Sequence, residues 1–301
     1  MRRTLDSVIT QTVKPDLWII VDDGSSDETP QILSQYEKAY NFIKIIKRDN
    51  RGRRSVGPGV IEAFYEGYKS IQNEDFEYLC KLDLDLELPS RYFEILLDRF
   101  RQNPRIGTCS GKPYFLNAAG KLVSEKCGDE NSVGMTKLYR RQCFEQIGGF
   151  VQQVMWDAID GHRCRMLGWI ARSWDEPELR FLHLRPMGSS QKGMLTGRMR
   201  HGFGQYYMGT GFIYMTVSAL YRMTRPPLFF GGLFMWLGYM KSMFSSAKHI
   251  DDKRFIHFLR RYQWSCLVRG KAAATARANR TTEPLWQPLG RSPYYLEAKE
   301  E

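Results

Sequence analysis

The stretch that decides the fold is YLCKLDLDLELP, residues 78–89. Its first half is a short apolar run, which predicts a buried strand. Acidic residues then alternate at Asp83, Asp85 and Glu87. Side chains two positions apart on a strand lie on one face, so Asp83 and Asp85 are expected to point at the same object. A divalent cation, Mg²⁺ or Mn²⁺, would offset their mutual repulsion. The alternative is an exposed strand end with solvated acids.

The composition is that of a globular protein with reduced thiols. The 301 residues are enough for one large domain or for a domain with an appendage. The six cysteines are scattered and form no C-x-x-C pair, which argues against a zinc knuckle or a disulfide framework. No secretory signal opens the chain, because its first residues lead straight into an amphipathic pattern. Both features favour a cytoplasmic protein.

The net charge of the chain limits the classes of partner that it is expected to bind. A net charge of +11 suits polyanions, which include nucleic acid, anionic lipid head groups and phosphorylated small molecules. The sequence has no RNA-recognition, zinc-finger or helix-turn-helix pattern, so nucleic acid is not expected as a partner.

Strand-like and helix-like segments alternate along the first part of the chain. Strands are expected at residues 16–22 and 42–46 and in the stretch that carries Asp83 and Asp85, with helices between them. This alternation predicts an α/β fold with a mainly parallel sheet and helices on both faces. Ligands of such sheets bind beyond the carboxyl ends of the strands. Asp22-Asp23 and Asp83-Asp85 both follow strand ends and are therefore expected to share one cleft.

Four blocks in this order resemble family 2 glycosyltransferases with the GT-A fold. The blocks are VDDGSSDET (21–29), LDLD (82–85), IGGF (147–150) and WDAIDGHRCRMLGW (156–169). The resemblance implies a GT-A domain over residues 1–190. Its sheet would be Rossmann-like, of the type found in nucleotide-diphospho-sugar transferases. Members of the family normally begin with a strand that this sequence lacks, so we expect a chain that is N-terminally incomplete, has another segment in that place, or is inactive.

The resemblance assigns the donor site. Asp22 and Asp23 correspond to the block that contacts the nucleotide, with Asp23 on the base, usually uracil. The alternative for either residue is a helix cap or an Asx turn. Asp83 and Asp85 match the motif that holds Mg²⁺ or Mn²⁺ against the donor diphosphate.

A basic loop adds candidate contacts to the donor diphosphate. The planar guanidinium groups of a basic loop, at Arg51, Arg53 and Arg54, can contact the diphosphate. A solvated basic loop is the alternative.

The acceptor side is assigned to the fourth block. Asp157 stands where family members carry the general base, and Asp160, three residues on, is the second choice. An acid that stabilises the first turn of a helix is the alternative reading. His183 lies where several family members place a metal-ligand histidine, although a lone histidine also serves structural roles. Asp23, Asp83, Asp85 and Asp157 are expected to converge on one pocket.

The composition changes in the C-terminal third. Residues 191–280 are expected to form helices that combine apolar and aromatic runs with many basic residues. This mixture is typical of helices lying on an anionic membrane surface. Packing against the catalytic domain or a dimer partner is the alternative. Residues 281–301 are expected to be loosely ordered.

The sequence thus predicts an inverting, metal-dependent glycosyltransferase at the cytoplasmic face of a membrane. It would move a sugar from a nucleotide-diphosphate donor, most simply a UDP-sugar, to a glycan or lipid-linked hydroxyl in surface polysaccharide synthesis. A non-catalytic nucleotide- or glycan-binding subunit of a membrane assembly and a sugar nucleotidyltransferase are the alternatives. Oligomerisation stays open.

Overall fold

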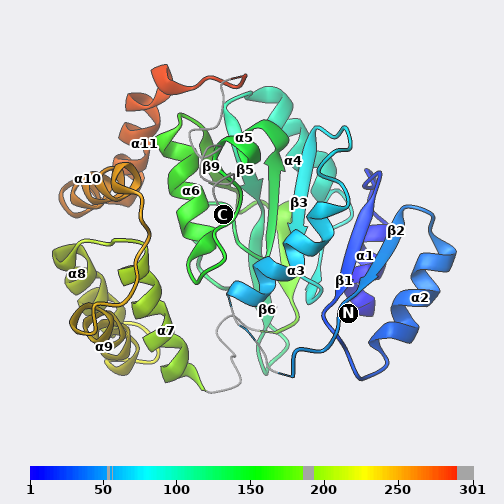
Figure 1. Ribbon diagram of the computed structural model, residues 1–301, viewed down its shortest axis with the longest axis horizontal. Coiled ribbons are helices and arrows are strands. Elements are labelled where there is room, and N and C mark those ends of the chain that lie inside the picture. The colour runs from blue at the N-terminus through cyan, green and yellow to red at the C-terminus, as the bar shows by residue number, and fades with distance from the viewer. Residues whose placement is uncertain (53–54, 56, 186–192, 290–301) are drawn as a thin grey trace. The chain divides into compact units, whose positions relative to one another are not determined.

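The computed structural model of the chain describes residues 1–52, 55, 57–185 and 193–289 (Figure 1). Its strands are β1 (Trp18–Asp22), β2 (Ile43–Lys47), β3 (Tyr78–Leu82), β4 (Leu86–Glu87), β5 (Ile106–Ser110), β6 (Lys112–Leu116), β7 (Leu122–Ser124), β8 (Thr136–Arg140), β9 (Ile170–Ser173) and β10 (Arg180–His183). Its α-helices are α1 (Arg2–Ile9), α2 (Thr29–Ala39), α3 (Pro58–Lys69), α4 (Tyr92–Gln102), α5 (Arg141–Gln146), α6 (Trp156–Met166), α7 (Met194–Tyr207), α8 (Phe212–Met223), α9 (Phe230–Phe244), α10 (Lys253–Arg269) and α11 (Lys271–Thr281).

The chain divides into two compact units. The first comprises Met1–Gln142, Phe150–Gln152 and Arg172–Arg185, and the second comprises Cys143–Gly149, Gln153–Ala171 and Pro186–Glu301. Helix α6 therefore groups with the C-terminal helices, where it packs against α10. This division differs from the sequence-based one, which placed the boundary at residue 190.

The strand pairing is mixed, whereas the alternation of strands and helices suggested a mainly parallel sheet. The sheets have the strand orders β1-β2, β4-β10-β6-β7 and β3-β8-β5-β9. Parallel pairing joins β1 to β2 and β6 to β10, while β3–β8, β5–β8, β4–β10 and β6–β7 are antiparallel. The α/β class and the helical C-terminal region are as expected from the sequence.

Helices cover both faces of the β1-β2 sheet. Ile20 of β1 and Ile43 of β2 share a buried cluster with Leu5 of α1 and Leu33 of α2. On the other face, α3 approaches the sheet at Gly67, where an added Cβ would touch the side chains of Ile19 and Val21. Successive strand residues point to opposite faces, so helices cover the apolar run of β1 on both sides, with Ile20 buried and Ile19 and Val21 partly buried.

In the second unit, glycine allows two helices to pack backbone to backbone. A Cβ on Gly202 of α7 would lie 2.0 Å from the carbonyl oxygen of Met235 in α9. A Cβ on Gly238 of α9 would lie 2.1 Å from the carbonyl oxygen of Met199 in α7. The small residues replace side-chain contacts with close backbone approach. Helix α8 packs on α9 beside this pair (Figure 1).

Candidate functional site

The first predicted acid, Asp22, ends β1 and shapes the turn that follows. Its carboxylate is buried and accepts a 2.9 Å hydrogen bond from the backbone N–H of Ser25. Gly24 has a φ of +81°, and an added Cβ would lie 2.4 Å from the Cα of Asn50. The side chain of Asn50 in turn donates to the carbonyl of Gly24. Asp22 thus holds the turn after β1 through a hydrogen bond to the N–H three residues on, and its role beside the nucleotide stays a prediction.

The second acid, Asp23, is held by two arginines of the loop after β2. Arg48 donates to Asp23 at 2.9 Å, and one nitrogen of Arg51 lies 2.7 and 2.5 Å from its two oxygens. The other guanidinium nitrogen of Arg51 contacts Glu62 of α3 at 2.6 Å. Arg51 thus engages the acid expected to contact the base, and its role on the diphosphate stays a prediction. Arg53 and Arg54 lie outside the described residues.

Asp83 and Asp85 do not alternate along one strand face as expected. Strand β3 ends at Leu82, and both acids lie in the turn before β4. Asp83 receives a 2.5 Å contact from the buried ammonium group of Lys81, which also donates to the carbonyl of Gly134. The two carboxylates have different cationic partners, Lys81 for Asp83 and Arg185 for Asp85.

Asp85 lies where the turn after β3 meets the end of β10. The backbone N–H of Leu184 donates to the carbonyl of Asp85 at 2.8 Å. Arg185 donates to Oδ2 of Asp85 from Nε at 3.0 Å and from a terminal nitrogen at 2.6 Å. The Nε2 atom of His183 lies 3.9 Å from the same oxygen. The structure thus brings together two of the three predicted metal ligands.

A carboxylate that sequence reasoning missed lies behind His183. Glu125, just after β7, has its oxygens 3.0 and 3.2 Å from Nδ1 of His183. Its side chain is only 4% exposed. The two residues are far apart in sequence, and Glu125 belongs to no motif, so no pattern in the sequence could have found it.

The side chains around Asp85 supply some, but not all, of the ligand atoms that a divalent cation needs. Within residues 1–52, 55, 57–185 and 193–289, no group of three or more His, Cys, Asp or Glu is close enough to hold a metal ion. A carboxylate oxygen and an imidazole nitrogen nevertheless face each other at Asp85 and His183. These are ligand types that Mn²⁺ and other first-row metals accept.

The two candidate bases differ in exposure. Both lie on α6, Asp157 in its first turn and Asp160 one turn later. Asp160 is 1% exposed, and its Oδ1 accepts a hydrogen bond from the N–H of Gly161. Asp157 is only partly buried, so it is the more accessible of the two. Their expected convergence with Asp23, Asp83 and Asp85 links the two units and stays a prediction.

The charge of Asp157 affects the pKa of His201 in α7. Burial, reinforced by the positive charge of Arg198, lowers the pKa of His201 to about 4, and Asp157 acts in the opposite direction. His201 is therefore neutral at pH 7.

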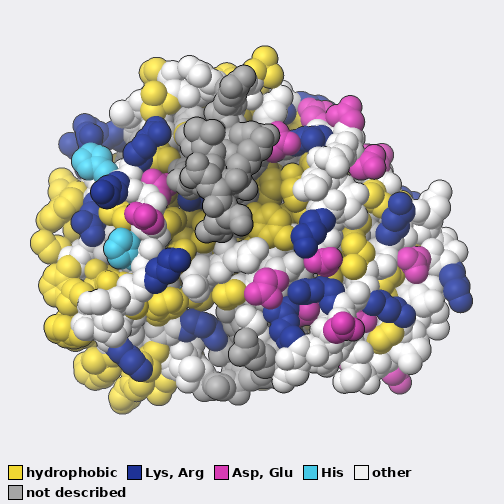
Figure 2. Space-filling model, viewed as in Figure 1, with side chains coloured by type: hydrophobic (Ala, Val, Ile, Leu, Met, Phe, Trp, Pro, Cys, Tyr) yellow, Lys and Arg dark blue, Asp and Glu magenta, His cyan; other side chains and the backbone are white. Residues whose placement is uncertain are grey.

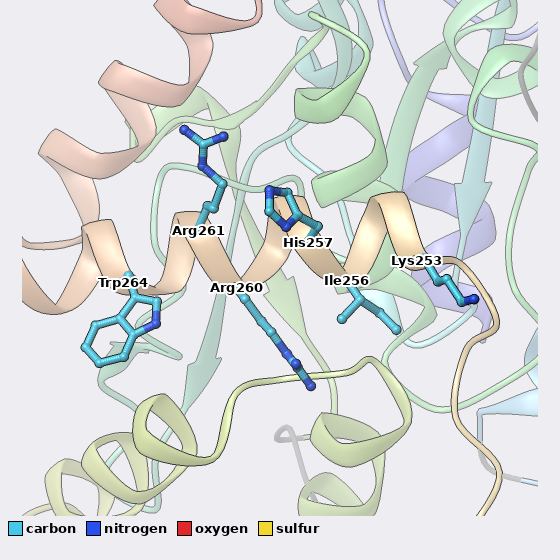
Figure 3. A pocket seen from close by; sticks show the side chains of 6 residues that line it. All are labelled: Lys253, Ile256, His257, Arg260, Arg261 and Trp264. Atoms are coloured by element: carbon cyan, nitrogen blue, oxygen red, sulfur yellow. The ribbon is translucent and has the colours of Figure 1, made fainter.

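The surface of the C-terminal helices combines apolar and cationic side chains. Ile213, Val217 and Leu220, at helical spacing on α8, are all exposed. Figure 2 shows apolar side chains gathered over α8 and α9 with lysines and arginines beside them. Helix α10 carries the residues labelled in Figure 3, which line a hollow of about 460 Å³: Lys253, Ile256, His257, Arg260, Arg261 and Trp264. Across the described part of the chain, no helix combines the length and apolar character needed to cross a membrane.

The family of the chain follows from its first half. Residues 1–155 match the family model of glycosyl transferase family 2. This is more than half of the 301 residues, and the chain belongs to glycosyltransferase family 2. The GT-A fold class expected from the four sequence blocks is confirmed by this membership together with the α/β architecture.

Similar proteins with assigned names match only part of the chain. A poly-beta-1,6-N-acetyl-D-glucosamine synthase of Staphylococcus epidermidis is 29% identical over 119 residues. The synthase of the same name from Staphylococcus aureus strain COL is 25% identical over 119 residues. Each alignment covers 40% of this chain and 26% of the relative, so the match spans about a quarter of these proteins' length.

Two solved structures resemble the chain over most of its length. The mannosyltransferase PcManGT of Pyrobaculum calidifontis, in complex with GDP-Man and Mn²⁺, superposes with a TM-score of 0.46 at 15% identity and covers 94% of this chain and 79% of its own. TarS residues 1–349 of S. aureus superpose with a TM-score of 0.46 at 14% identity and cover 99% of this chain and 88% of their own.

Proposed function

We propose that the protein is an inverting, metal-dependent glycosyltransferase that uses a nucleotide-diphosphate sugar, most simply a UDP-sugar. The observation that carries the proposal is the set of acidic and basic groups at the ends of β1, β3 and β10. There, Asp23 is held by Arg48 and Arg51, and Asp85 faces His183. A donor with a base, a diphosphate and a sugar requires such a combination of carboxylates and cationic groups.

The donor side would use residues of the first unit. Asp22 shapes the turn that presents Asp23, and Asp23 would accept a hydrogen bond from the base. Asp83, Asp85 and His183 would hold Mg²⁺ or Mn²⁺, which when bound offsets negative charge on the departing diphosphate. Arg51, Arg53 and Arg54 remain candidates for diphosphate contacts.

The acceptor side would use Asp157. Its carboxylate would take the proton of the acceptor hydroxyl as that oxygen attacks the anomeric carbon. The bond between the anomeric carbon and the diphosphate oxygen breaks, the diphosphate leaves with the electron pair, and the configuration inverts. The burial of Asp160 supports Asp157 as the base, because a general base must reach the substrate proton.

We further propose that the acceptor is a growing surface glycan or a lipid-linked sugar, and that the protein acts on an anionic membrane surface at the cytoplasmic side. The segment from residue 179 to residue 250 contains no Asp or Glu but carries arginines and lysines. Burial and the neighbouring Arg222 lower the pKa of Arg198, and burial and the neighbouring Arg225 lower that of Arg222. Lipid phosphates would relieve this crowding of positive charge.

The test is a screen of sugar nucleotides for Mn²⁺-dependent hydrolysis and transfer. We expect turnover with at least one donor and its loss in Asp85→Ala. Asp157→Asn should lower turnover by about 10² to 10⁴-fold while nucleotide binding is kept. Nucleotide binding without any turnover, unchanged by Asp157→Asn, would instead support a non-catalytic binding subunit.

A further inference from the structure

We propose that two adjoining hollows on the C-terminal helices form a binding site for a single anionic phospholipid. Its phosphate would lie against the basic face of α10, and one hydrocarbon chain would lie between α8, α9 and α10. The inference rests on the proposed action at an anionic membrane surface and deepens it from general adhesion to recognition of one lipid molecule. It concerns the second unit alone, because all residues of both hollows lie within Pro186–Glu301.

The first hollow, of about 460 Å³, follows one face of α10. Its lining residues recur at spacings of three and four along the helix, so they form a continuous stripe: Lys253, Ile256, His257, Arg260, Arg261 and Trp264 (Figure 3). The opposite side of the same helix is buried in the protein through Phe255 and Leu259. Helix α10 is thus anchored by one side and presents the stripe on the other.

The stripe offers positive charge to a ligand. It contains Lys253, Arg260 and Arg261, and none of the described residues that line the two hollows is an Asp or Glu. The acid next to the stripe in sequence, Asp252, serves as the N-cap of α10, where its Oδ1 accepts the N–H of Phe255 at 2.8 Å. Guanidinium groups match the geometry of phosphate oxygens, so phosphate is the anion that the stripe suits best.

The second hollow continues from the first, because Arg260 and Trp264 line both. Its volume of about 580 Å³ lies within the range of roughly 300–1,000 Å³ that is typical of small-ligand sites. Its walls are mainly apolar and aromatic and include Phe212, Ile213 and Met243. Trp264 is 55% exposed and Ile213 is 51% exposed. Apolar surface gathered in this way gains free energy when hydrocarbon covers it.

Two polar side chains of the second hollow are already hydrogen-bonded within the protein. The Oε1 of Gln263 accepts the N–H of Gly211 at 3.0 Å, and its Nε2 donates to the hydroxyl of Thr210 at 3.2 Å. The hydroxyl of Tyr239 donates to the carbonyl of Thr210 at 2.8 Å. The hollow therefore presents mainly apolar surface to a ligand, which favours a hydrocarbon chain over a sugar, whose hydroxyls would lose their hydrogen bonds to water.

Arg260 and Trp264 lie where the basic and the apolar hollow meet. Figure 3 shows Arg260 extending from α10 toward the segment before α8, where its Nε donates to the carbonyl of Gly209 at 3.1 Å. This bond fixes the stem of the side chain beside the apolar hollow. Indole rings favour boundaries between polar and apolar surroundings. A phospholipid has the same succession of phosphate, boundary and hydrocarbon, whereas an acidic peptide or a nucleotide has no chain to fill the second hollow.

The experiment titrates the full chain with single-chain lipid phosphates that are soluble without a bilayer. Hexyl, octyl and decyl phosphate are added below their micelle-forming concentrations, and calorimetry follows binding. Octyl glucoside supplies the same chain without charge, and inorganic phosphate supplies the head group without a chain. Flotation with vesicles of mixed phosphatidylglycerol and phosphatidylcholine then relates this binding to the membrane surface.

The variants separate the head group from the chain. Arg260→Gln removes the guanidinium group at the junction. Lys253→Gln combined with Arg261→Gln lowers the charge of the stripe and keeps the hydrogen bond of Arg260, so it replaces Arg260→Gln if that variant does not fold. Trp264→Ala removes the exposed indole that both hollows share.

The matched controls are Arg254→Gln and Phe230→Ala. Arg254 is an exposed arginine of α10, and Phe230 is an exposed aromatic residue at the start of α9. Neither residue lines either hollow. Both variants should therefore bind alkyl phosphates as the wild type does.

In the wild type we expect affinity to rise about two- to fourfold with each added CH₂, because the chain enters an apolar hollow. Octyl phosphate should bind at least tenfold more tightly than octyl glucoside or inorganic phosphate. The charge variants should weaken all three alkyl phosphates by a common factor of about five to ten. Trp264→Ala should instead reduce the gain per CH₂.

Affinity that does not rise with chain length, or equal binding of octyl phosphate and octyl glucoside, would overturn the proposal even if no variant folds. Inorganic phosphate bound as tightly as octyl phosphate would mean a site for free phosphate and would also overturn it. Equal losses in Trp264→Ala and Phe230→Ala would place the chain outside these hollows. Vesicle binding without alkyl phosphate binding would refute this inference alone, whereas alkyl phosphate binding without vesicle binding would refute only the proposed action at a membrane surface.

Discussion

A single guanidinium nitrogen of Arg51 lies 2.7 and 2.5 Å from the two carboxylate oxygens of Asp23. Its other terminal nitrogen contacts Glu62 at 2.6 Å. The hydrogen bond and charge of Asp23 raise the pKa of Arg51, so the guanidinium group keeps its positive charge in alkaline solution. Asp23 therefore has a fixed orientation before any ligand arrives.

Replacing Arg51 should weaken nucleotide binding. In Arg51→Gln, Asp23 loses the contact that orients it, and we expect UDP affinity to fall about three- to tenfold, since hydrogen bonds to charged groups are typically worth about 1.5–3 kcal/mol and less when exposed. Arg48→Gln removes one contact to Asp23 and should have the smaller effect. Calorimetric titration with UDP measures both. Equal losses, or tighter binding in Arg51→Gln, would contradict the positioning role.

Removing Arg185 should strengthen cation binding. Arg185 donates twice to the Asp85 oxygen that faces His183, so a divalent cation must displace it. The pair is largely exposed on the arginine side, and we expect Arg185→Ala to tighten Mn²⁺ binding about two- to fivefold. Arg180→Ala, on the same strand but paired with Asp175, is the control. Weaker Mn²⁺ binding in Arg185→Ala would mean that the arginine supports the site.

The sequence was sufficient to locate Asp85 and His183 at strand ends, because apolar runs mark buried strands. It was not sufficient to orient the acids. The alternation in LDLD suggested one strand face, but β3 ends at Leu82 and both acids lie in the turn that leads into β4. Where a strand stops depends on pairing with β8, which lies more than fifty residues further along the chain.

The position of Glu125 and the direction of the strands also depend on long-range contacts that the sequence does not reveal. The contact between Glu125 and His183 joins β7 to β10 and depends on the folded sheet, so neither local propensity nor spacing encodes it. Alternating strands and helices predicted parallel neighbours, yet β8 is inserted antiparallel between β3 and β5. Long-range pairing decides this arrangement.

Gly111, between β5 and β6, should not tolerate a side chain. An added Cβ would lie 1.8 Å from the carbonyl oxygen of Leu179 and 2.8 Å from the ring of Tyr92. Because a backbone carbonyl cannot move aside, we expect Gly111→Ala to lower the free energy of unfolding by at least about 3 kcal/mol. Gly211→Ala is the control, since its Cβ would meet nothing closer than 3.6 Å. Urea denaturation compares them, and a loss in Gly111→Ala no larger than in Gly211→Ala would contradict the packing.

The neutral His201 should make stability depend on pH in acid. Its folded-state pKa of about 4 lies below the unperturbed 6.5, so between these values the unfolded chain binds more protons. Stability from this group is complete above pH 6.5 and is lost as the pH falls toward 4, by at most about 3 kcal/mol.

Thermal unfolding between pH 7 and pH 4 tests this dependence. His201→Gln should flatten the curve in that window, and His257→Gln, on the exposed side of α10, should leave it unchanged. An unchanged slope in His201→Gln would assign the acid sensitivity to other groups.

The apolar face of α8 and the turn after it should carry the membrane contact. Ile213, Leu220 and Phe229 are each more than half exposed, so replacing them with serine removes little packing within the protein. In a bilayer surface each would bury apolar area worth about 1.5–3 kcal/mol, and each nearby arginine adds about 1 kcal/mol on anionic lipid. We expect the triple serine variant to bind vesicles of mixed phosphatidylglycerol and phosphatidylcholine at least tenfold more weakly in flotation assays.

The control for this variant is Leu116→Ser with Leu122→Ser, which removes two equally exposed leucines that face each other on the β6–β7 hairpin. Binding that falls with salt and with Arg222→Gln, but not with the hairpin variant, would locate the contact on the C-terminal helices. Equal losses in both serine variants would mean that general surface hydrophobicity holds the protein on lipid. Retained binding in the triple variant would remove α8 from the membrane contact and favour its packing against a protein partner, since an exposed apolar helix face of this kind serves either purpose.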